Sequence, residues 1–177
     1  MEDIKKLTDV ALIACLAALI AASSVFVLPI GPVPMTLQTM AVAIAGMLLG
    51  PRRGILAVLL YVLAGVAGAP VFAGGRAGLG VLFGPTGGYL AGFAAMAAIC
   101  GMARHGQPAW KSALWLLLGI GVLHGCGIMG ICFSLGRTPV QALIMDVAFI
   151  PGDLFKSVLA LLVWLALTRK GTHDRRA

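Results

Sequence analysis

The chain has 177 residues, of which 60% are apolar and only 11% are charged, and its formal net charge is +7. A soluble domain carries about 25% charged residues, whereas a disordered chain combines low hydrophobicity with high charge. The composition therefore excludes both classes. It predicts an all-α, polytopic integral membrane protein in which residues 1–177 form a single transmembrane domain.

Apolar runs along the chain predict six transmembrane helices. In chain order the runs are Thr8–Leu28, Thr36–Leu49, Gly54–Ala67, Gly87–Ala103, Ser112–Phe133 and Val147–Thr168. A full crossing needs about 20 residues, at a rise of about 1.5 Å per residue. The second and third runs are shorter than this, so they are either thinned spans or helices that extend into their flanking residues.

Basic residues lie in pairs at the ends of the runs, which does not fit the basic stripe of a nucleic-acid-binding protein. If the N-terminus is cytoplasmic and all six runs cross, only Arg76 and Arg137 lie outside, while Lys156 falls within the sixth run. The positive-inside rule then predicts that both termini are cytoplasmic. The basic residues on the inner side are Lys5, Lys6, Arg52, Arg53, Arg104, Lys111, Arg169, Lys170, Arg175 and Arg176.

Two connections on the predicted outer face are longer than the basic inner ones. The segment Pro29–Pro34 has proline at three of its six positions, which predicts a stiff, extended connector. From Gly68 to Gly88, eight of twenty-one residues are glycine and Arg76 is the only charge. A loop of this kind over the mouth of a helix bundle is either a lid over a ligand or an ordinary flexible connector.

Asp153 and Lys156 are an oppositely charged pair near the outer end of the sixth run. They are three residues apart, so both side chains project from one face of a helix. Ionisable groups inside a membrane are costly unless they face protein or water, and they mark functional sites by default. The pair therefore predicts a binding site for a small polar or anionic solute. The alternative is an intrahelical ion pair that only neutralises itself.

Other polar residues in the runs carry weaker predictions. Thr86 is expected to cap the fourth helix, and Tyr89 offers a ring face and a hydroxyl group one turn later. Gln38 either lines a cavity or packs between helices. His124 is expected to be a packed, hydrogen-bonded histidine because no carboxylate lies near it in the sequence. Asp146 is expected to be solvated at the outer boundary.

The first run carries small residues along one helical face: Ala11, Ala14, Cys15, Ala18, Ala21 and Ala22. Helices in lipid associate through close backbone approach, which small residues permit. This face, and above all Ala14, Ala18 and Ala22, is predicted to dock a separate transmembrane protein. The alternative is packing against another helix of the same chain. Gly46-x₃-Gly50 and Gly121-x₃-Gly125 are predicted to be further helix-packing motifs.

The sequence lacks the motifs that are typical of several other classes of activity. The sequence contains no Walker A motif, so an ATP-driven step would need an ATPase on another chain. An enzyme would need a nucleophile beside a base or converging carboxylates or histidines, and a channel usually needs rings of like charge. No metal ligand cluster and no cofactor motif is found, and the cysteines have no CxxC spacing. The alternatives that stay open are an intramembrane enzyme and a secondary transporter for another small carboxylate-bearing solute.

With these features in view, the chain resembles the BioY family of biotin transporters, the substrate-binding S components of energy-coupling factor (ECF) transporters. Five segments carry the resemblance along essentially the whole chain: residues 31–39 (GPVPMTLQT), 49–54 (LGPRRG), 68–75 (GAPVFAGG), 84–89 (GPTGGY) and 151–156 (PGDLFK). The resemblance implies six helices with cytoplasmic termini in the bacterial cytoplasmic membrane. It also implies a coupling protein and ABC-type ATPase subunits as partners.

The resemblance implies biotin as the ligand, bound from outside beneath the first outer loop and the glycine-rich loop. The family's binding aspartate and lysine correspond to Asp153 and Lys156. Its Gly-Pro-Thr-Gly-Gly-Tyr segment adds Thr86, Gly87 and Tyr89. Gln38 and Arg76 complete the expected site.

Overall fold

The computed structural model describes residues 2–29 and 32–173, with side chains as far as Thr168. Gly31 of the first outer loop and Arg175 and Arg176 of the basic C-terminus lie outside these residues. The helices are α1 (Glu2–Ser23), α2 (Gln38–Val66), α3 (Gly87–Cys100), α4 (Ala109–Leu135), α5 (Pro139–Val147) and α6 (Ile150–His173). Two short strands, β1 (Val27–Leu28) and β2 (Met35–Thr36), and a 3₁₀ helix, η1 (Leu79–Phe83), lie between them.

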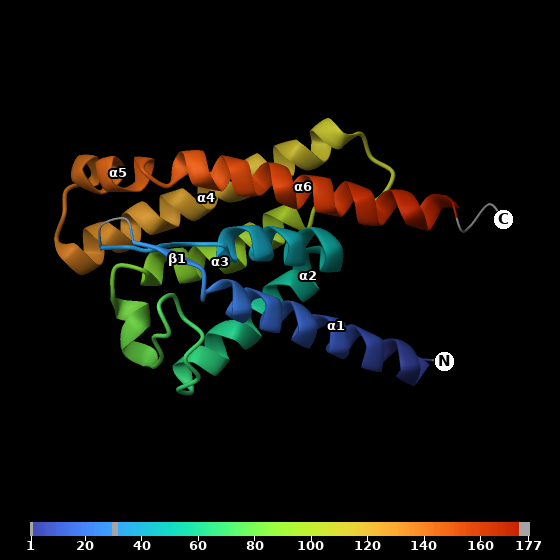
Figure 1. Ribbon diagram of the computed structural model, residues 1–177, viewed down its shortest axis with the longest axis horizontal. Helices are drawn as coiled ribbons and strands as arrows, with labels where there is room; N and C mark the ends of the chain where they lie inside the picture. Colours follow the sequence, from blue (N-terminus) through green and yellow to red (C-terminus); the bar gives the residue numbers. More distant parts are fainter. Residues whose placement is uncertain (1, 30–31, 174–177) are drawn as a thin grey trace.

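The second and third apolar runs form the two arms of α2, which bends sharply at Gly50. Gly50 has φ 79° and ψ 175°, a conformation that L side chains rarely adopt, and Pro51 starts the next helical turn. Figure 1 shows the first arm running toward the end of the molecule that carries both termini, and the second arm running back. The two predicted runs with a basic connection between them are therefore two arms of one helix, and the connection is its kink.

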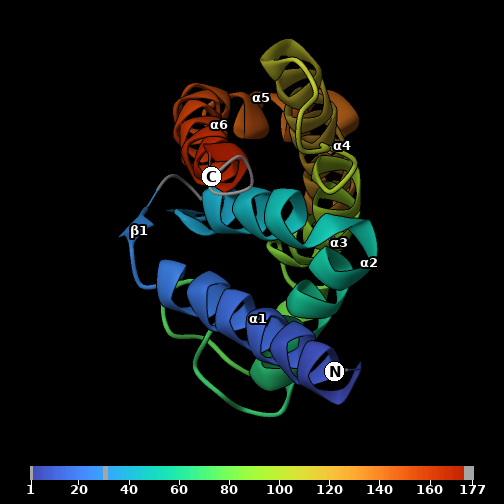
Figure 2. The same ribbon diagram turned by 90° about the vertical axis from the view of Figure 1, so that its right-hand side faces the viewer.

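The first arm of α2 is the core of the bundle. It lies between α1 and α6, with α3 beside it, as Figure 2 shows from the end with the termini. Every residue of the stretch 41–47 is buried. A helix that is apolar on all sides is a buried helix, and one without a lipid-facing surface need not match the bilayer thickness. This explains why the run is short.

Glycine brings α2 and α3 together. A Cβ atom at Gly46 would overlap the Ala97 backbone, and one at Gly101 would overlap the backbone at Pro51. The packing role predicted for Gly46 is thus confirmed, whereas Gly50 of the same motif has no atom near the position of a Cβ and forms the kink instead. The same prediction is wrong for Gly121 and Gly125 within this chain, because both are exposed with no atom near the position of a Cβ.

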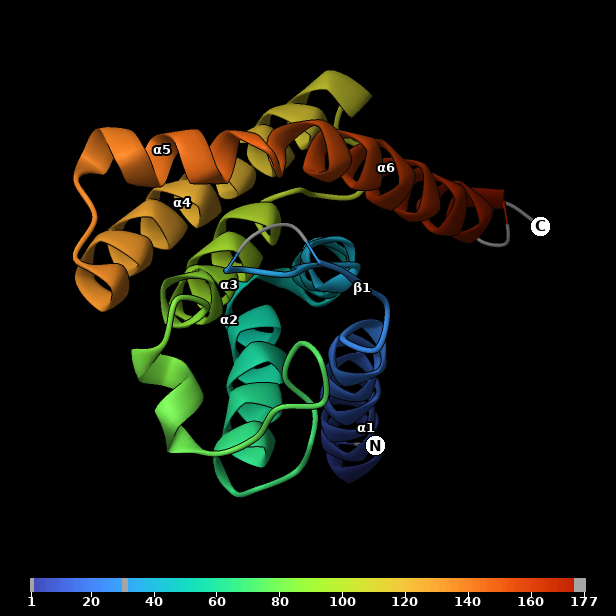
Figure 3. The same cartoon turned by 60° about the vertical axis from the view of Figure 1, so that its left-hand side comes forward.

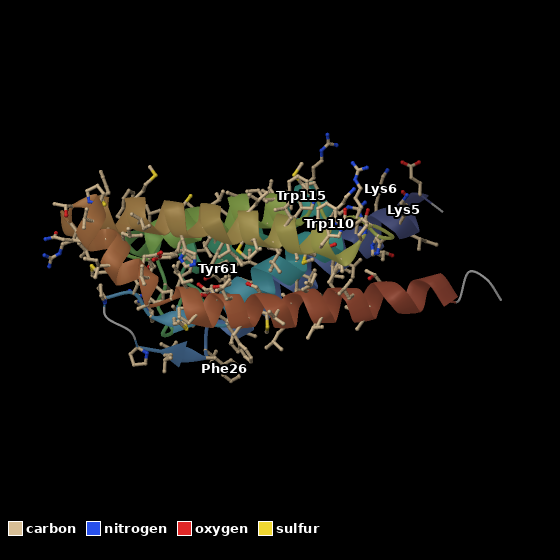
Figure 4. All side chains as sticks on the ribbon, turned by 90° about the horizontal axis from the view of Figure 1, so that it is seen from above. Lys5, Lys6, Phe26, Tyr61, Trp110 and Trp115 are labelled. Carbon is tan, nitrogen blue, oxygen red and sulfur yellow. The ribbon has the colours of Figure 1, made fainter. Side chains whose placement is uncertain are left out.

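The chain runs back and forth between two ends. One end carries both termini, the kink of α2 and the α3–α4 connection, whereas the opposite end carries the β1–β2 pair, η1 and the α4–α5 connection (Figures 1 and 3). Lys5, Lys6, Trp110 and Trp115 gather toward the first end in Figure 4. Among the described helices, α1, α2, α4 and α6 are long and apolar enough to span a membrane. The architecture is that of a helical multi-pass membrane protein.

The outer connections are more structured than the sequence suggested. β1 and β2 pair in antiparallel fashion, with Val27 opposite Thr36 and Leu28 opposite Met35. In the glycine-rich loop, Phe72 is fully buried and meets the ring of Tyr61 edge-on at 5.7 Å between centroids. Two-residue strands and single aromatic anchors leave no periodic pattern in a sequence, so an all-α expectation misses them.

The sixth run is interrupted at its start. α5 begins with a capping box, in which the Thr138 side chain accepts from the Gln141 amide, and it ends at Val147. α6 follows almost in line after Ala148 and Phe149 (Figure 3). This break allows α5 to direct one face toward α4 while α6 packs on α2 and α4.

Candidate binding site

A cavity lies at the end of the molecule that carries the β1–β2 pair. Its walls come from the β2 segment, α2, the glycine-rich loop, α3, α4 and α6. The lining residues are Val33, Pro34, Met35, Thr36, Gln38, Thr39, Phe72, Ala73, Thr86, Tyr89, Leu90, Phe93, Leu123, Phe149, Asp153 and Lys156.

Asp153 and Lys156 both face this cavity, and each is only 5% exposed. Lys156 Nζ lies 2.5 Å from Asp153 Oδ1 and donates a hydrogen bond to the backbone oxygen of Thr36 at 2.8 Å. The lysine therefore points inward and ties α6 to strand β2. Asp153 lies in the first turn of α6, where the helix dipole favours a negative charge.

A second carboxylate reaches the site from α5. Asp146 is 1% exposed, and its Oδ1 accepts a hydrogen bond from the Tyr89 hydroxyl at 2.5 Å. His124 Nδ1 lies 2.9 Å from the same oxygen, and His124 Nε2 lies 3.5 Å from Asp153 Oδ2. The expectation that Asp146 is solvated is therefore wrong.

The sequence held a signal for Asp146. In α5, Ala142 and Asp146 are one helical turn apart, so they share a face, and both are buried. The prediction that His124 is packed and hydrogen-bonded is confirmed. The reason given for it fails, because Asp146 is 22 positions away in the sequence and adjacent in space.

Gln38 and Tyr61 form a second polar pair. Gln38 is 3% exposed, lines the cavity, and donates from Nε2 to the Tyr61 hydroxyl at 2.6 Å. It also donates to the Ile20 backbone oxygen at 3.4 Å. Both sequence alternatives therefore hold at once, since Gln38 lines the cavity and joins α2 to α1. Tyr61 was missed because one tyrosine in an apolar run gives no periodic signal.

Thr86, Gly87 and Tyr89 lie where α3 begins. Thr86 has helical backbone angles and makes no side-chain cap, so the predicted capping role is wrong. Its hydroxyl is buried and lines the cavity. A Cβ atom at Gly87 would overlap the Leu82 backbone, and one at Gly127 of α4 would overlap the Tyr89 ring. These two glycines therefore fix how closely the loop and α4 approach the site.

Arg76 does not reach the cavity in this structure. It is exposed, and its Nε donates to the backbone oxygen of Ala73 at 3.0 Å. Ala73 itself lines the cavity. A role for Arg76 in binding stays a prediction.

Two of the buried polar atoms that lack a hydrogen-bond partner among the described residues belong to the cavity wall. They are Thr86 Oγ1 and Asp153 Oδ1. Asp153 Oδ1 is neutralised by the Lys156 ammonium group, although this ion pair lacks hydrogen-bond geometry. An unpaired buried polar atom costs about 1–3 kcal/mol. The Thr86 hydroxyl, which has no ion-pair partner either, therefore indicates where a polar ligand would bind.

The small-residue face of α1 points away from the bundle. Ala14, Ala18 and Ala22 are all exposed, whereas Ala17, Ile20 and Ser23 are the buried positions of the helix. Of the residues that define this face, Ala21 is half-buried against the core of the chain, whereas Ala14, Ala18 and Ala22 are not covered by it. The use of this face as a docking surface stays a prediction.

Comparison with known proteins shows the family of the chain. A model described as the BioY family matches residues 1–172. The chain belongs to the BioY family. It is 37% identical over 175 residues to the biotin transporter BioY2 of Lactococcus lactis subsp. cremoris, covering 97% of this chain and 96% of that protein.

Two further similar proteins support the same family. The biotin transporter BioY of Rhodobacter capsulatus is 40% identical, with 88% of this chain and 90% of that protein covered. A crystal structure of the S component for biotin from an ECF-type ABC transporter superimposes with a TM-score of 0.89 at 28% identity. That likeness covers 96% of this chain and 95% of the other. These relatives are transporters and transporter components, and not enzymes.

Proposed function

We propose that this chain binds biotin and takes it up across the bacterial cytoplasmic membrane as the substrate-specific S component of an ECF transporter. The observation that carries the proposal is the buried Asp153–Lys156 pair, which faces a small-molecule cavity in a chain that matches the BioY family along its length. The proposed function requires the site to bind and release the ligand, without making or breaking a covalent bond.

The chemistry of the cavity suits biotin. The ureido ring of biotin offers two N–H donors and one carbonyl acceptor, and its valerate chain ends in a carboxylate. Asp153 accepts from the ureido N–H groups, while Lys156 donates to the carbonyl or pairs with the carboxylate. Thr86 Oγ1 can donate or accept, and Phe93 and Leu90 offer apolar surface to the thioether ring. Charge-assisted hydrogen bonds in a cavity poor in water are among the strong ones.

The proposal includes six membrane crossings with both termini in the cytoplasm. The two arms of α2 count as separate crossings, and α5 with α6 counts as one. The positive-inside bias and the placement of both termini, the α2 kink and the α3–α4 connection at one end support this topology.

Cysteine labelling in intact cells tests this topology. In a variant without the four native cysteines, a membrane-impermeant maleimide should label a cysteine introduced at Arg137 and spare one at Gly106. Labelling at Gly106 and protection at Arg137 would reverse the orientation.

We also assign the energy source to other chains. A transmembrane coupling protein would dock on the exposed face around Ala14, Ala18 and Ala22, with ABC-type ATPase subunits bound to it. Small residues on this face permit the close backbone approach on which association in lipid depends.

The direct test is equilibrium binding of radiolabelled biotin to the purified chain without partner proteins. We expect saturable binding of one biotin per chain, with the ligand recovered unchanged. Pentanoate, which carries the carboxylate without the ureido ring, should not compete. Absence of saturable biotin binding by folded protein would reject the proposed ligand, and competition by pentanoate would point to a general carboxylate site.

A further inference from the structure

Four ionisable side chains form one continuous buried cluster behind and within the cavity wall. Asp146, His124, Asp153 and Lys156 contact one another in that order, and each is less than 9% exposed. Asp153 and Lys156 line the cavity, whereas Asp146 and His124 do not. The latter pair therefore acts on a ligand only through the residues that line the cavity.

The charges of this cluster balance only if it holds one additional proton. Two carboxylates and one ammonium group leave a net charge of −1 when His124 is neutral. With His124 protonated, the sum is zero. An uncompensated charge that is cut off from water is strongly destabilising, so the balanced state is favoured.

The geometry around the imidazole points to the same state. Nδ1 faces Asp146 at 2.9 Å and Nε2 faces Asp153 at 3.5 Å, so each ring nitrogen has a carboxylate oxygen as its neighbour. A neutral imidazole has one N–H group, and its other nitrogen would direct a lone pair at a carboxylate. An imidazolium ion donates a hydrogen bond to Asp146 and places its positive charge beside Asp153, with which Nε2 makes a charge contact and no hydrogen bond.

The two carboxylates have their own reasons to stay ionised. Asp146 Oδ1 accepts from the Tyr89 hydroxyl, and Asp153 Oδ1 lies against the Lys156 ammonium group. A proton placed on either carboxyl would compete with these donors. His124 is thus the group that best accommodates the additional proton.

We infer that His124, held by Asp146, is a positioning residue for the proposed biotin site, and that it works as an imidazolium ion that neutralises and orients Asp153. This inference rests on the proposed function. The groups that face His124 are Tyr89 on α3, Asp146 on α5, and Asp153 and Lys156 on α6. When alkaline pH removes the His124 proton to water, the cluster gains a net charge of −1 and biotin binding weakens.

Charge-balanced variants test the inference through biotin affinity. His124→Gln leaves Asp146 uncompensated, so we expect affinity to fall by at least about tenfold, which corresponds to about 1.4 kcal/mol. His124→Gln combined with Asp146→Asn restores the charge balance but not the imidazolium that orients Asp153, so it should bind at least about threefold more tightly than His124→Gln while staying weaker than wild type. A role in packing alone predicts no such rescue. A double variant that binds no better than His124→Gln would overturn the inference.

The pH dependence of biotin affinity separates wild type from the double variant. From about pH 6 to about pH 9.5, a range that extends well above the titration of a free imidazole, wild-type affinity should fall at the alkaline end. The double variant, which has no imidazole at this position, should keep a constant affinity. Equal alkaline loss in both proteins would contradict the inference.

A spectroscopic measurement makes the inference independent of biotin. In protein labelled with ¹⁵N-histidine and free of ligand, the ring nitrogens of His124 should give imidazolium shifts at neutral pH, assigned by their loss in His124→Gln. Neutral-tautomer shifts would overturn the inference even if biotin binds. Failure of the wild-type chain to bind biotin would reject the proposed function and leave this measurement valid.

Discussion

The cavity end of α6 and the outer face of α1 are built in opposite ways. Around Asp153, polar atoms from four helices are buried and paired with one another across long stretches of sequence. On α1, Ala14, Ala18 and Ala22 lie exposed. In the first region polar side chains pair with other residues of the chain, whereas in the second region small side chains are left without a covering helix. Changes in one region should therefore alter ligand binding, and changes in the other should alter assembly.

The largest effect is expected from breaking the buried ion pair. Asp153→Asn and Lys156→Ala each leave a partner charge stranded in the cavity, which costs about 2–5 kcal/mol. Biotin affinity should fall by about 30-fold to several-thousand-fold, at about 1.4 kcal/mol per decade. Isothermal titration of biotin into purified variants measures the change.

Leu154→Ala is the matched control, because Leu154 lies on the same turn of α6 and is 44% exposed. It should bind biotin like wild type. If both charge variants bind within about threefold of wild type, the pair is structural and the proposed site is wrong.

The next effect should fall on assembly alone. Replacing Ala14 and Ala18 by Trp blocks close approach of another helix, so ATP-driven uptake and copurification of the coupling protein should fall at least about tenfold. Biotin binding in detergent should change little. Leu12→Trp provides the control, since Leu12 is exposed on another face of α1. Loss of folding and binding together would place the face inside the functional bundle instead.

Sequence reasoning recovered the parts of this molecule that depend on local pattern. The apolar runs, the break between the second and third runs and the Asp153–Lys156 spacing all follow from neighbouring residues. The contacts within the polar cluster could not be predicted from the sequence. Helical periodicity identifies which face of a helix is buried, but not which other helix covers that face. Asp146 lies on a short helix hidden at the boundary of two apolar runs, so its burial depends on how α5 docks on α4.

A smaller effect is expected from a substitution at Gly127, against which the Tyr89 ring packs. Gly127→Ala puts a methyl group where the ring lies, and such overpacking costs about 1–3 kcal/mol. We expect a lower melting temperature and weaker biotin binding, because Tyr89 anchors Asp146. Gly125→Ala on the same helix meets open space and should leave both unchanged. Equal behaviour of the two variants would mean that Tyr89 shifts without consequence.

The smallest effect is expected at the ion pair that joins α1 to the second arm of α2. Arg53 lies 2.6 Å from Asp9, but the two side chains are 44% and 25% exposed, in contrast to Asp153 and Lys156. Solvent-accessible pairs contribute about 0–1 kcal/mol, and salt screens them. A double-mutant cycle with Arg53→Gln and Asp9→Asn should therefore give a coupling below about 1 kcal/mol that shrinks in high salt. Biotin affinity should not change, because the pair lies far along the helices from the β1–β2 end. A salt-independent coupling of several kcal/mol would show that the link between α1 and α2 is as buried in the membrane as the pair at the cavity.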